Sequence, residues 1–200
     1  MKTINPSELS PMRVQMILQT AVSPRPIALA STIDKNGNVN LSPFSFFNLF
    51  SSNPPILIFS PARRVRDHST KDTLHNVLEV PEVVIGNVNF DMVQQVSLSS
   101  TEYETGVDEF IKSGLTKKPA ELVKPPLIAE SPVNFECKVI EVKPLGNEGG
   151  AGNLVICEVL KIHIREEFLN DEGNLDQKKL DLVSRLGGNW YGRTTAETLF

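Results

Sequence analysis

Short apolar runs, bounded by prolines and turn residues, recur along the whole chain and constrain its fold more than any other feature. They are rich in the β-branched and aromatic residues that favour strands. Helical patterns do not alternate regularly with them, which disfavours a doubly wound parallel sheet. We therefore predict a mainly β protein, an antiparallel barrel with helical insertions, in a single domain over residues 1–200. The predicted strands cover residues 27–33, 39–50, 56–59, 83–88, 133–142 and 154–164.

Three interruptions indicate how these strands connect. Asn36 and Gly37 follow the first strand and can take positive φ, which predicts a tight hairpin. Pro43 interrupts the second run, and because proline cannot donate to a ladder it indicates a bulge or a sheet edge. The glycine-rich stretch 146–152 joins the last two strands as a flexible hairpin.

Helical patterns occupy four other stretches, at residues 7–21, 69–77, 91–122 and 176–186. Ser69 is expected to be the N-cap of the second, with Asp72 three residues later in a capping-box arrangement. Asp108 and Glu109 suit the first turn of a helix inside the third.

Composition excludes several classes of partner. The 200 residues are 40% hydrophobic and 22% charged, with a net charge of -4, and this acidic balance argues against a nucleic-acid partner. No apolar run approaches the roughly 20 residues of a membrane span, and the N-terminus lacks a signal-peptide core. Cys137 and Cys157 lie in apolar runs, so we expect buried free thiols and not a disulfide. We expect a cytoplasmic protein.

The sequence contains no motif that predicts a reaction carried out by side chains alone. His68, His75 and His163 lack the spacing of a metal site, and no nucleophile elbow is present. The stretch Gly146–Gly152 links two strands instead of opening a helix, so it supports neither a dinucleotide fingerprint nor a P-loop. A bound cofactor is therefore the natural carrier of any chemistry.

One part of the chain is physically suited to hold a phosphate. Lys71 and Thr73 open a predicted helix, where backbone N–H groups and the helix dipole favour an anion. Arg63, Arg64 and Arg66 form the locally basic stretch just before it. The alternative is that these residues are ordinary turn formers beside a solvated arginine loop.

Ordered blocks along nearly the whole chain resemble the flavin-reductase-like family of FMN-binding split barrels. The blocks are Ser23-Pro-Arg-Pro-Ile-Ala-Leu-Ala-Ser-Thr32, Asn40-Leu-Ser-Pro-Phe-Ser-Phe-Phe-Asn48, Pro54-Pro55, Lys71-Asp-Thr73, Ser113-Gly-Leu-Thr116, Pro132-Val-Asn-Phe-Glu-Cys-Lys138 and Arg185-Leu-Gly-Gly-Asn-Trp-Tyr191. Several blocks in one order are far more specific than any one of them.

The resemblance implies a Greek-key split barrel that forms a homodimer with FMN at the subunit interface. FAD is the alternative cofactor, since it shares the isoalloxazine and the first phosphate. The resemblance places Ser31 and Thr32 beside the flavin or ribityl chain. It places Ser42, Pro43, Phe44 and Ser45 along the isoalloxazine edge, with Asn40 and Asn48 nearby. It places Ser60, Lys71 and Thr73 at the phosphate and Asp72 as a helix cap, while Arg185 and Tyr191 reach the site from the partner subunit.

The implied activity is that of an NAD(P)H-dependent flavin reductase in which flavin N5 is the hydride site, and no side chain is assigned a catalytic role. One departure from the family weakens the nicotinamide part. Members that use nicotinamide often carry a Gly-Asp-His motif, whereas this chain has Gly152-Asn153-Leu154.

That departure leaves two alternatives open. The first is a flavoredoxin-like FMN electron carrier that does not use NAD(P)H directly and works with a redox partner protein. The second is a non-catalytic FMN-binding module. The insertion over residues 91–122 is larger than a minimal reductase needs, and it is expected to cover the flavin face.

Overall fold

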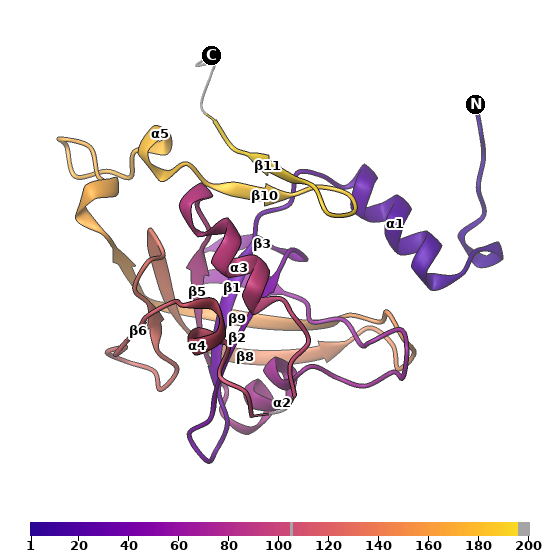
Figure 1. Ribbon diagram of the computed structural model, residues 1–200, viewed down its shortest axis with the longest axis horizontal. Coiled ribbons are helices and arrows are strands. Elements are labelled where there is room, and N and C mark those ends of the chain that lie inside the picture. The colour runs from indigo at the N-terminus through magenta and orange to yellow at the C-terminus, as the bar shows by residue number, and fades with distance from the viewer. Residues whose placement is uncertain (105, 196–200) are drawn as a thin grey trace.

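A curled antiparallel sheet of seven strands forms the body of the computed structural model, which describes residues 1–104 and 106–195 (Figure 1). Its strand order is β2-β1-β5-β8-β9-β4-β3, and every neighbouring pair is antiparallel. The predicted mainly β architecture is confirmed. The strands of this sheet are β1 Ala28–Ile33, β2 Val39–Phe44, β3 Phe47–Ser52, β4 Pro55–Phe59, β5 Glu82–Asn87, β8 Val133–Pro144 and β9 Asn153–Ile164.

The sheet curls because one face of nearly every strand contributes to the same core. Side chains from β1, β2, β4, β5, β8 and β9 meet there, together with Leu74 and Val77 from helix α2 (Asp72–Glu79). Phe44 and Phe59 both belong to this core, with their ring centroids 5.3 Å apart. The two edge strands, β2 and β3, follow one another in the chain, and β2 carries Pro43 as an edge strand can.

The outer face of β1 and β5 is covered by the insertion. Helices α3 (Val93–Ser99) and α4 (Glu109–Ser113) lie across these strands (Figure 1), and Val96 and Phe110 pack there against Leu29 and Val84. The other elements that the structure describes are η1 Pro6–Glu8, α1 Pro11–Ala21, η2 Phe90–Met92, β6 Lys117–Lys118, β7 Leu127–Ile128, η3 Glu166–Phe168, α5 Gln177–Leu180, β10 Val183–Arg185 and β11 Tyr191–Arg193.

The predicted start of the second helix was wrong. Helix α2 begins at Asp72, its N-cap position is Lys71, and it has no side-chain cap. Ser69 instead donates both its backbone N–H and its hydroxyl to Asp67, at 2.9 and 2.5 Å. This Asx-type turn engages Ser69 before a helix can start, because aspartate competes well for nearby backbone donors. Asp72 is therefore the first helical residue and not the cap.

Two stretches predicted as helical are more broken than expected. Within residues 91–122, Ser99 and Ser100 donate their hydroxyls to the carbonyls of Val96 and Ser97, and α3 ends there. Glu109 lies in the first turn of α4, as predicted, whereas Asp108 is its N-cap and accepts from Phe110 N–H.

The last predicted helix is also shorter than expected. Asp181 has a left-handed φ of 45°, so α5 ends after one turn. The chain that follows forms the β10–β11 hairpin instead of extending the helix.

The two cysteines are buried free thiols, as predicted. They lie on β8 and β9, inside the barrel core. Burial raises the pKa of the Cys137 thiol to about 12, and the charge of Glu136 adds to the shift. A thiol that resists ionisation in this way is a packing group and not a nucleophile.

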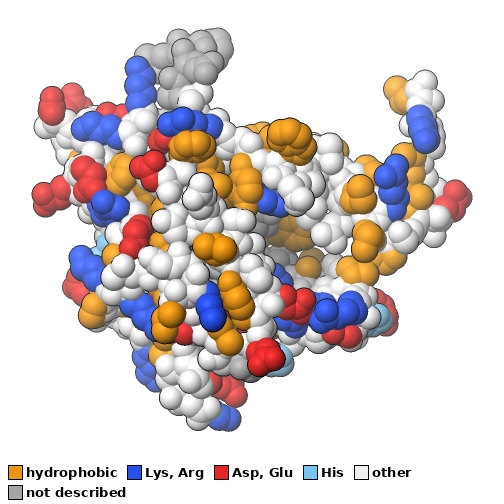
Figure 2. Space-filling model, in the orientation of Figure 1, with side chains coloured by type: hydrophobic (Ala, Val, Ile, Leu, Met, Phe, Trp, Pro, Cys, Tyr) orange, Lys and Arg blue, Asp and Glu red, His pale blue; other side chains and the backbone are white. Residues whose placement is uncertain are grey.

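Helix α1 stands apart from the barrel. None of its 11 residues is buried, and Met12, Met16 and Leu18 are all more than half exposed. Figure 2 shows hydrophobic side chains gathered on this helix and around the hollow between it and the barrel. A cavity of about 490 Å³ lies in that hollow, lined by Val14, Phe46 and other residues.

Candidate functional site

A polar cavity of about 220 Å³ opens where β2, the start of α2 and the insertion meet. Strand β2, the start of α2 and Arg64 from the loop before α2 form one side, whereas the other side comes from residues 99–103 and Glu109 of the insertion. Most of its side chains carry a hydroxyl, an amide or a charge. The lining residues are Asn40, Ser42, Arg64, Lys71, Asp72, Thr73, Ser99, Ser100, Thr101, Glu102, Tyr103 and Glu109.

Lys71 is the cation most withdrawn from water in this cavity. Its ammonium lies 5.1 Å from the centre of the Phe44 ring. Among the ion pairs and hydrogen bonds of the described residues, none engages this ammonium with a carboxylate. Burial lowers the pKa of Lys71 and the neighbouring charge of Arg64 lowers it further, while the charge of Glu102 acts in the opposite direction. A partly buried cation that forms no ion pair is costly, so the position is suited to receive an anion.

Arg64 forms the second cationic wall. Its Nε lies 2.7 Å from a carboxylate oxygen of Glu102, and its Nη1 donates to Ser69 Oγ at 3.1 Å and to the carbonyl of Thr70 at 2.7 Å. Arg66 reaches the same Glu102 oxygen at 3.0 Å. Glu102 is half exposed, so it neutralises these arginines from the rim of the cavity.

A chain of hydrogen bonds runs through the cavity wall. Thr73 Oγ1 donates to Asn40 Oδ1 at 2.6 Å, and Asn40 Nδ2 donates to Glu109 Oε1 at 2.7 Å. The backbone N–H of Leu41 donates to the other carboxylate oxygen of Glu109 at 3.0 Å. Glu109 is buried, and this desolvation raises its pKa more than the hydrogen bonds from Leu41 and Asn40 lower it.

The structure brings five of the predicted site residues into this one cavity: Asn40, Ser42, Lys71, Asp72 and Thr73. Phe44 adjoins them through its contact with Lys71. Pro43 alternates with Ser42 and Phe44 along β2 and so points to the opposite face of the strand.

Ser31 and Thr32 are buried but lie outside the cavity lining. As neighbours on β1 they point to opposite faces of the sheet. Thr32 Oγ1 accepts from Asn76 of α2 at 3.1 Å. The Ser31 hydroxyl is buried without a hydrogen-bond partner among the described residues.

The remaining predicted residues are spread around the barrel end. Ser45 Oγ accepts from Arg25 Nε at 3.4 Å. Asn48 is exposed on β3, and Ser60 is buried with its hydroxyl against Gly152. Arg185 stacks over Tyr191, with 4.5 Å between guanidinium and ring centre. These residues do not line the Lys71 cavity, and their contacts with a ligand stay predictions.

Seven lining residues were not among the predicted site residues. Arg64 belongs to the basic stretch that the sequence had already marked as suited to phosphate. Glu109 was read only as part of a helix first turn. Residues 99–103 carry no recognisable motif, and only their place in the insertion pointed to them.

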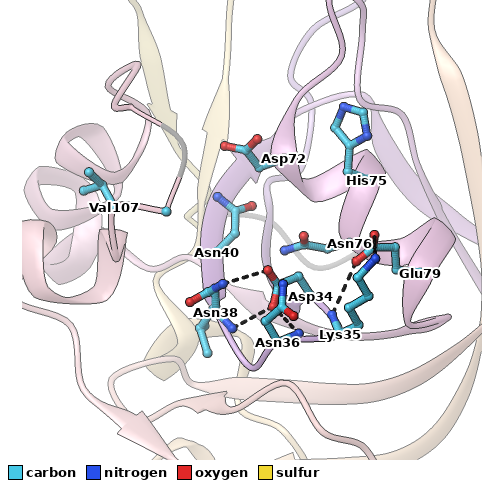
Figure 3. A pocket seen from close by; sticks show the side chains of 12 residues that line it. Asp34, Lys35, Asn36, Asn38, Asn40, Asp72, His75, Asn76, Glu79 and Val107 are labelled. Carbon is cyan, nitrogen blue, oxygen red and sulfur yellow. Dashed lines mark hydrogen bonds and ion pairs between the residues drawn. The ribbon is translucent and has the colours of Figure 1, made fainter.

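A second polar cavity of about 450 Å³ adjoins the first and shares Asn40 and Asp72 with it (Figure 3). Its polar groups largely satisfy one another. Asp34 accepts from Asn38 Nδ2 at 2.8 Å, and Lys35 pairs with Glu79 at 3.3 Å. We therefore assign the ligand-facing role to the Lys71 cavity.

In the part of the chain that the structure describes, no group of three or more histidine, cysteine or acidic side chains is arranged to hold a metal ion. None of the helices in residues 1–104 and 106–195 is both long and apolar enough to cross a membrane.

Comparison with known sequences identifies the family of this chain. The model of the flavin reductase like domain matches residues 21–180. An uncharacterised protein of Halalkalibacterium halodurans is 38% identical over 192 residues, which cover 95% of this chain and 91% of the relative.

Solved structures share the whole architecture. Nitrilotriacetate monooxygenase component B from Bacillus cereus is 27% identical, with a TM-score of 0.93 over 100% of this chain and 98% of its own. A protein with a split-barrel domain from Shewanella frigidimarina is 23% identical, with a TM-score of 0.82 over 97% of this chain and 94% of its own. The split-barrel fold expected from the sequence is thereby supported.

Proposed function

The chain belongs to the flavin reductase-like family, and on that premise we propose that it binds FMN and transfers electrons from NAD(P)H through the bound flavin. The flavin would lie with its phosphate in the Lys71 cavity. The ammonium of Lys71, which is partly withdrawn from water and lies over the Phe44 ring, is the observation that carries this assignment.

The donor set of the cavity fits a phosphate monoester. Lys71 and Arg64 supply positive charge, and the first turn of α2 directs backbone N–H groups toward the same place. Thr101 adds a hydroxyl from the insertion, whereas the hydroxyl protons of Ser99 and Ser100 are already donated to the carbonyls of Val96 and Ser97. Their position supports the expectation that residues 91–122 cover part of the flavin site.

The cavity is too small for a whole flavin. Sites for complete small-molecule ligands measure roughly 300–1,000 Å³, and this one measures about 220 Å³. It suits the phosphate end, so the ring system would extend along Phe44 and Ser45 toward the hollow beneath α1. That hollow is largely apolar, as an isoalloxazine requires.

We propose that a second copy of the chain completes the site. Helix α1 exposes Met12 and Met16, and edge strand β3 exposes Leu49 and Phe50. A surface of this kind favours association. Light scattering at micromolar concentration should give the mass of a dimer, and a monomer would remove the shared flavin site.

When bound, the flavin supplies the hydride and electron chemistry at its N5. The chain's own residues hold and orient it. Lys71 and Arg64 neutralise the phosphate, and the buried Phe44 keeps water from the inner wall of the cavity. Backbone N–H groups near Ser42–Ser45 would stabilise negative charge on the reduced ring, since fixed donors cost no reorganisation.

An FMN electron carrier without direct NAD(P)H use is the second candidate, and the stretch Gly152–Leu154 favours it. In place of the histidine motif, buried Asn153 donates its side chain to the carbonyl of Pro61 at 3.0 Å. That contact fixes the buried side chain at the start of β9, and the imidazole of the motif is absent from this position.

An absorbance spectrum of the purified protein, followed by NADH and NADPH under anaerobic conditions, tests both candidates. Prompt bleaching of a yellow protein supports the reductase. A yellow protein that stays oxidised, yet is reduced by a ferredoxin-type donor, supports the carrier. A colourless protein that also ignores added FMN contradicts flavin binding.

A further inference from the structure

Glu109 dictates which way the hydrogen bonds run in the cavity wall. An ionised carboxylate can only accept hydrogen bonds. Asn40 must therefore turn its NH₂ group toward Glu109, which leaves its Oδ1 facing Thr73. The single proton of the Thr73 hydroxyl is then used to reach Asn40, and the hydroxyl has only lone pairs left for a ligand in the cavity.

We propose that Glu109 is a positioning residue that tunes the specificity of this cavity for phosphate by setting the direction of the Asn40–Thr73 hydrogen bonds. The proposal rests on the proposed function, because it concerns the phosphate end of the flavin. While Glu109 is ionised, Thr73 does not donate to the phosphate, and Lys71 and Arg64 hold it without that hydroxyl.

Neutralising Glu109 reverses the chain of hydrogen bonds. A glutamine in its place accepts from Leu41 N–H through its oxygen and donates its NH₂ to Asn40 Oδ1. Asn40 then turns its own NH₂ to Thr73, and the Thr73 proton becomes free to point into the cavity. No backbone atom has to move, since each step exchanges a donor for an acceptor at hydrogen-bond distance.

The surroundings of Glu109 support this role. Its burial raises its pKa, and the charge of Asp72 on α2 acts in the same direction. The other charged groups that line the cavity are Arg64, Lys71 and Glu102. Glu109 lies on α4, so the insertion influences Thr73 of α2 through the side chain of Asn40. Glu109 itself does not have to contact the ligand.

The test compares FMN with riboflavin, which lacks the phosphate, using flavin fluorescence to measure both affinities. The chains are wild type, Glu109→Gln, Thr73→Val and the double variant. Glu109→Gln should raise the preference for FMN over riboflavin about tenfold, the value of one added hydrogen bond to a charged group. In the Thr73→Val background this gain should vanish.

Each other outcome overturns the inference. A gain that persists with Thr73→Val would show that only the lost charge matters. An unchanged preference in a folded Glu109→Gln chain would show that the hydrogen bonds do not reverse. Thr73→Val alone should leave the preference nearly unchanged, and a loss of fivefold or more would show that Thr73 already donates to the phosphate.

The Thr73→Val measurement does not depend on the folding of the Glu109 variant, because valine and threonine have nearly the same shape. The failure of the proposed function is also distinguishable. It would appear as a wild-type chain that binds neither flavin, or binds both equally. An FMN-selective wild type whose variants depart from these expectations contradicts only the role of Glu109.

Discussion

Two buried glutamates, Glu109 and Glu136, have nearly opposite environments. Glu136 on β8 is completely buried and accepts hydrogen bonds from the backbone N–H groups of residues 121–123, at 2.6–3.0 Å, and from His163 Nε2 at 2.5 Å. Glu109 lines a cavity and accepts from one backbone N–H outside its own helix and from Asn40. One carboxylate is saturated with donors, and the other is not.

Their pKa values shift in opposite directions as a result. Burial acts to raise the pKa of Glu136, but the hydrogen bonds from the backbone and from His163 outweigh it and the net shift is downward. For Glu109 burial prevails, and the pKa is raised. A buried carboxylate whose oxygens all accept hydrogen bonds holds a loop in place. One with fewer donors beside a cavity can change its hydrogen bonds when a ligand binds there.

The largest expected effect comes from removing the saturated carboxylate. Glu136→Ala should lower the free energy of unfolding by about 3–5 kcal/mol, because buried donors lose their partner. Urea unfolding measures this. Glu121→Gln is the matched control on the same loop, where the exposed carboxylate pairs with Lys161 and should change stability by less than about 1 kcal/mol. Similar losses in both variants would contradict the contrast.

On the cavity side, Lys71→Ala should weaken FMN about 10- to 100-fold while affecting riboflavin much less, because the lost contact is to phosphate. The control is Lys35→Ala, an exposed lysine that pairs with Glu79 in the neighbouring cavity. Equal losses for the two flavins would show that Lys71 does not contact the phosphate.

A smaller effect is expected from the carboxylate at the rim. Glu102→Gln releases Arg64 and Arg66 for an incoming phosphate, so FMN affinity should rise by no more than about fivefold, as befits half-exposed ion pairs. Glu148→Gln, which removes an exposed partner of His68, is the control and should change nothing. Weaker FMN binding in Glu102→Gln would indicate that this loop holds the arginines in place.

The smallest effect separates the two glutamates by pH. The pKa of Glu136 is lowered, so its contribution to stability is complete above the ordinary value of 4.5 and is lost as pH falls through the lower folded value. The pKa of Glu109 is raised, so its contribution to folding stability is complete below 4.5, where it is protonated. That contribution is lost as pH rises through the higher folded value. Urea unfolding of wild type, Glu136→Gln and Glu109→Gln from pH 3 to 7 should place the two changes on opposite sides of 4.5. Changes on the same side would remove the distinction.

Local features of the sequence were sufficient to predict most of the sheet. The Asn36-Gly37 turn does join β1 to β2, with Gly37 at φ 90°, and Pro43 does lie on an edge strand. Strand patterns and turns depend on neighbouring residues, so they can be read along the chain. The site was predictable to the extent that Asn40, Ser42, Lys71, Asp72 and Thr73 belong to family blocks, and these five do share one cavity.

The mainly β architecture, the buried thiols and one wall of the cavity could thus be predicted from the chain. The other wall, and the pKa shifts of its charged groups, depend on tertiary contacts. Glu109 and Glu136 look alike in the chain, and only the fold brings Asn40 to one and three backbone N–H groups to the other. The start of α2 also depended on Asp67 engaging Ser69. The physical reason is that the state of a buried polar group depends on partners distant in sequence, which periodicity and composition do not encode.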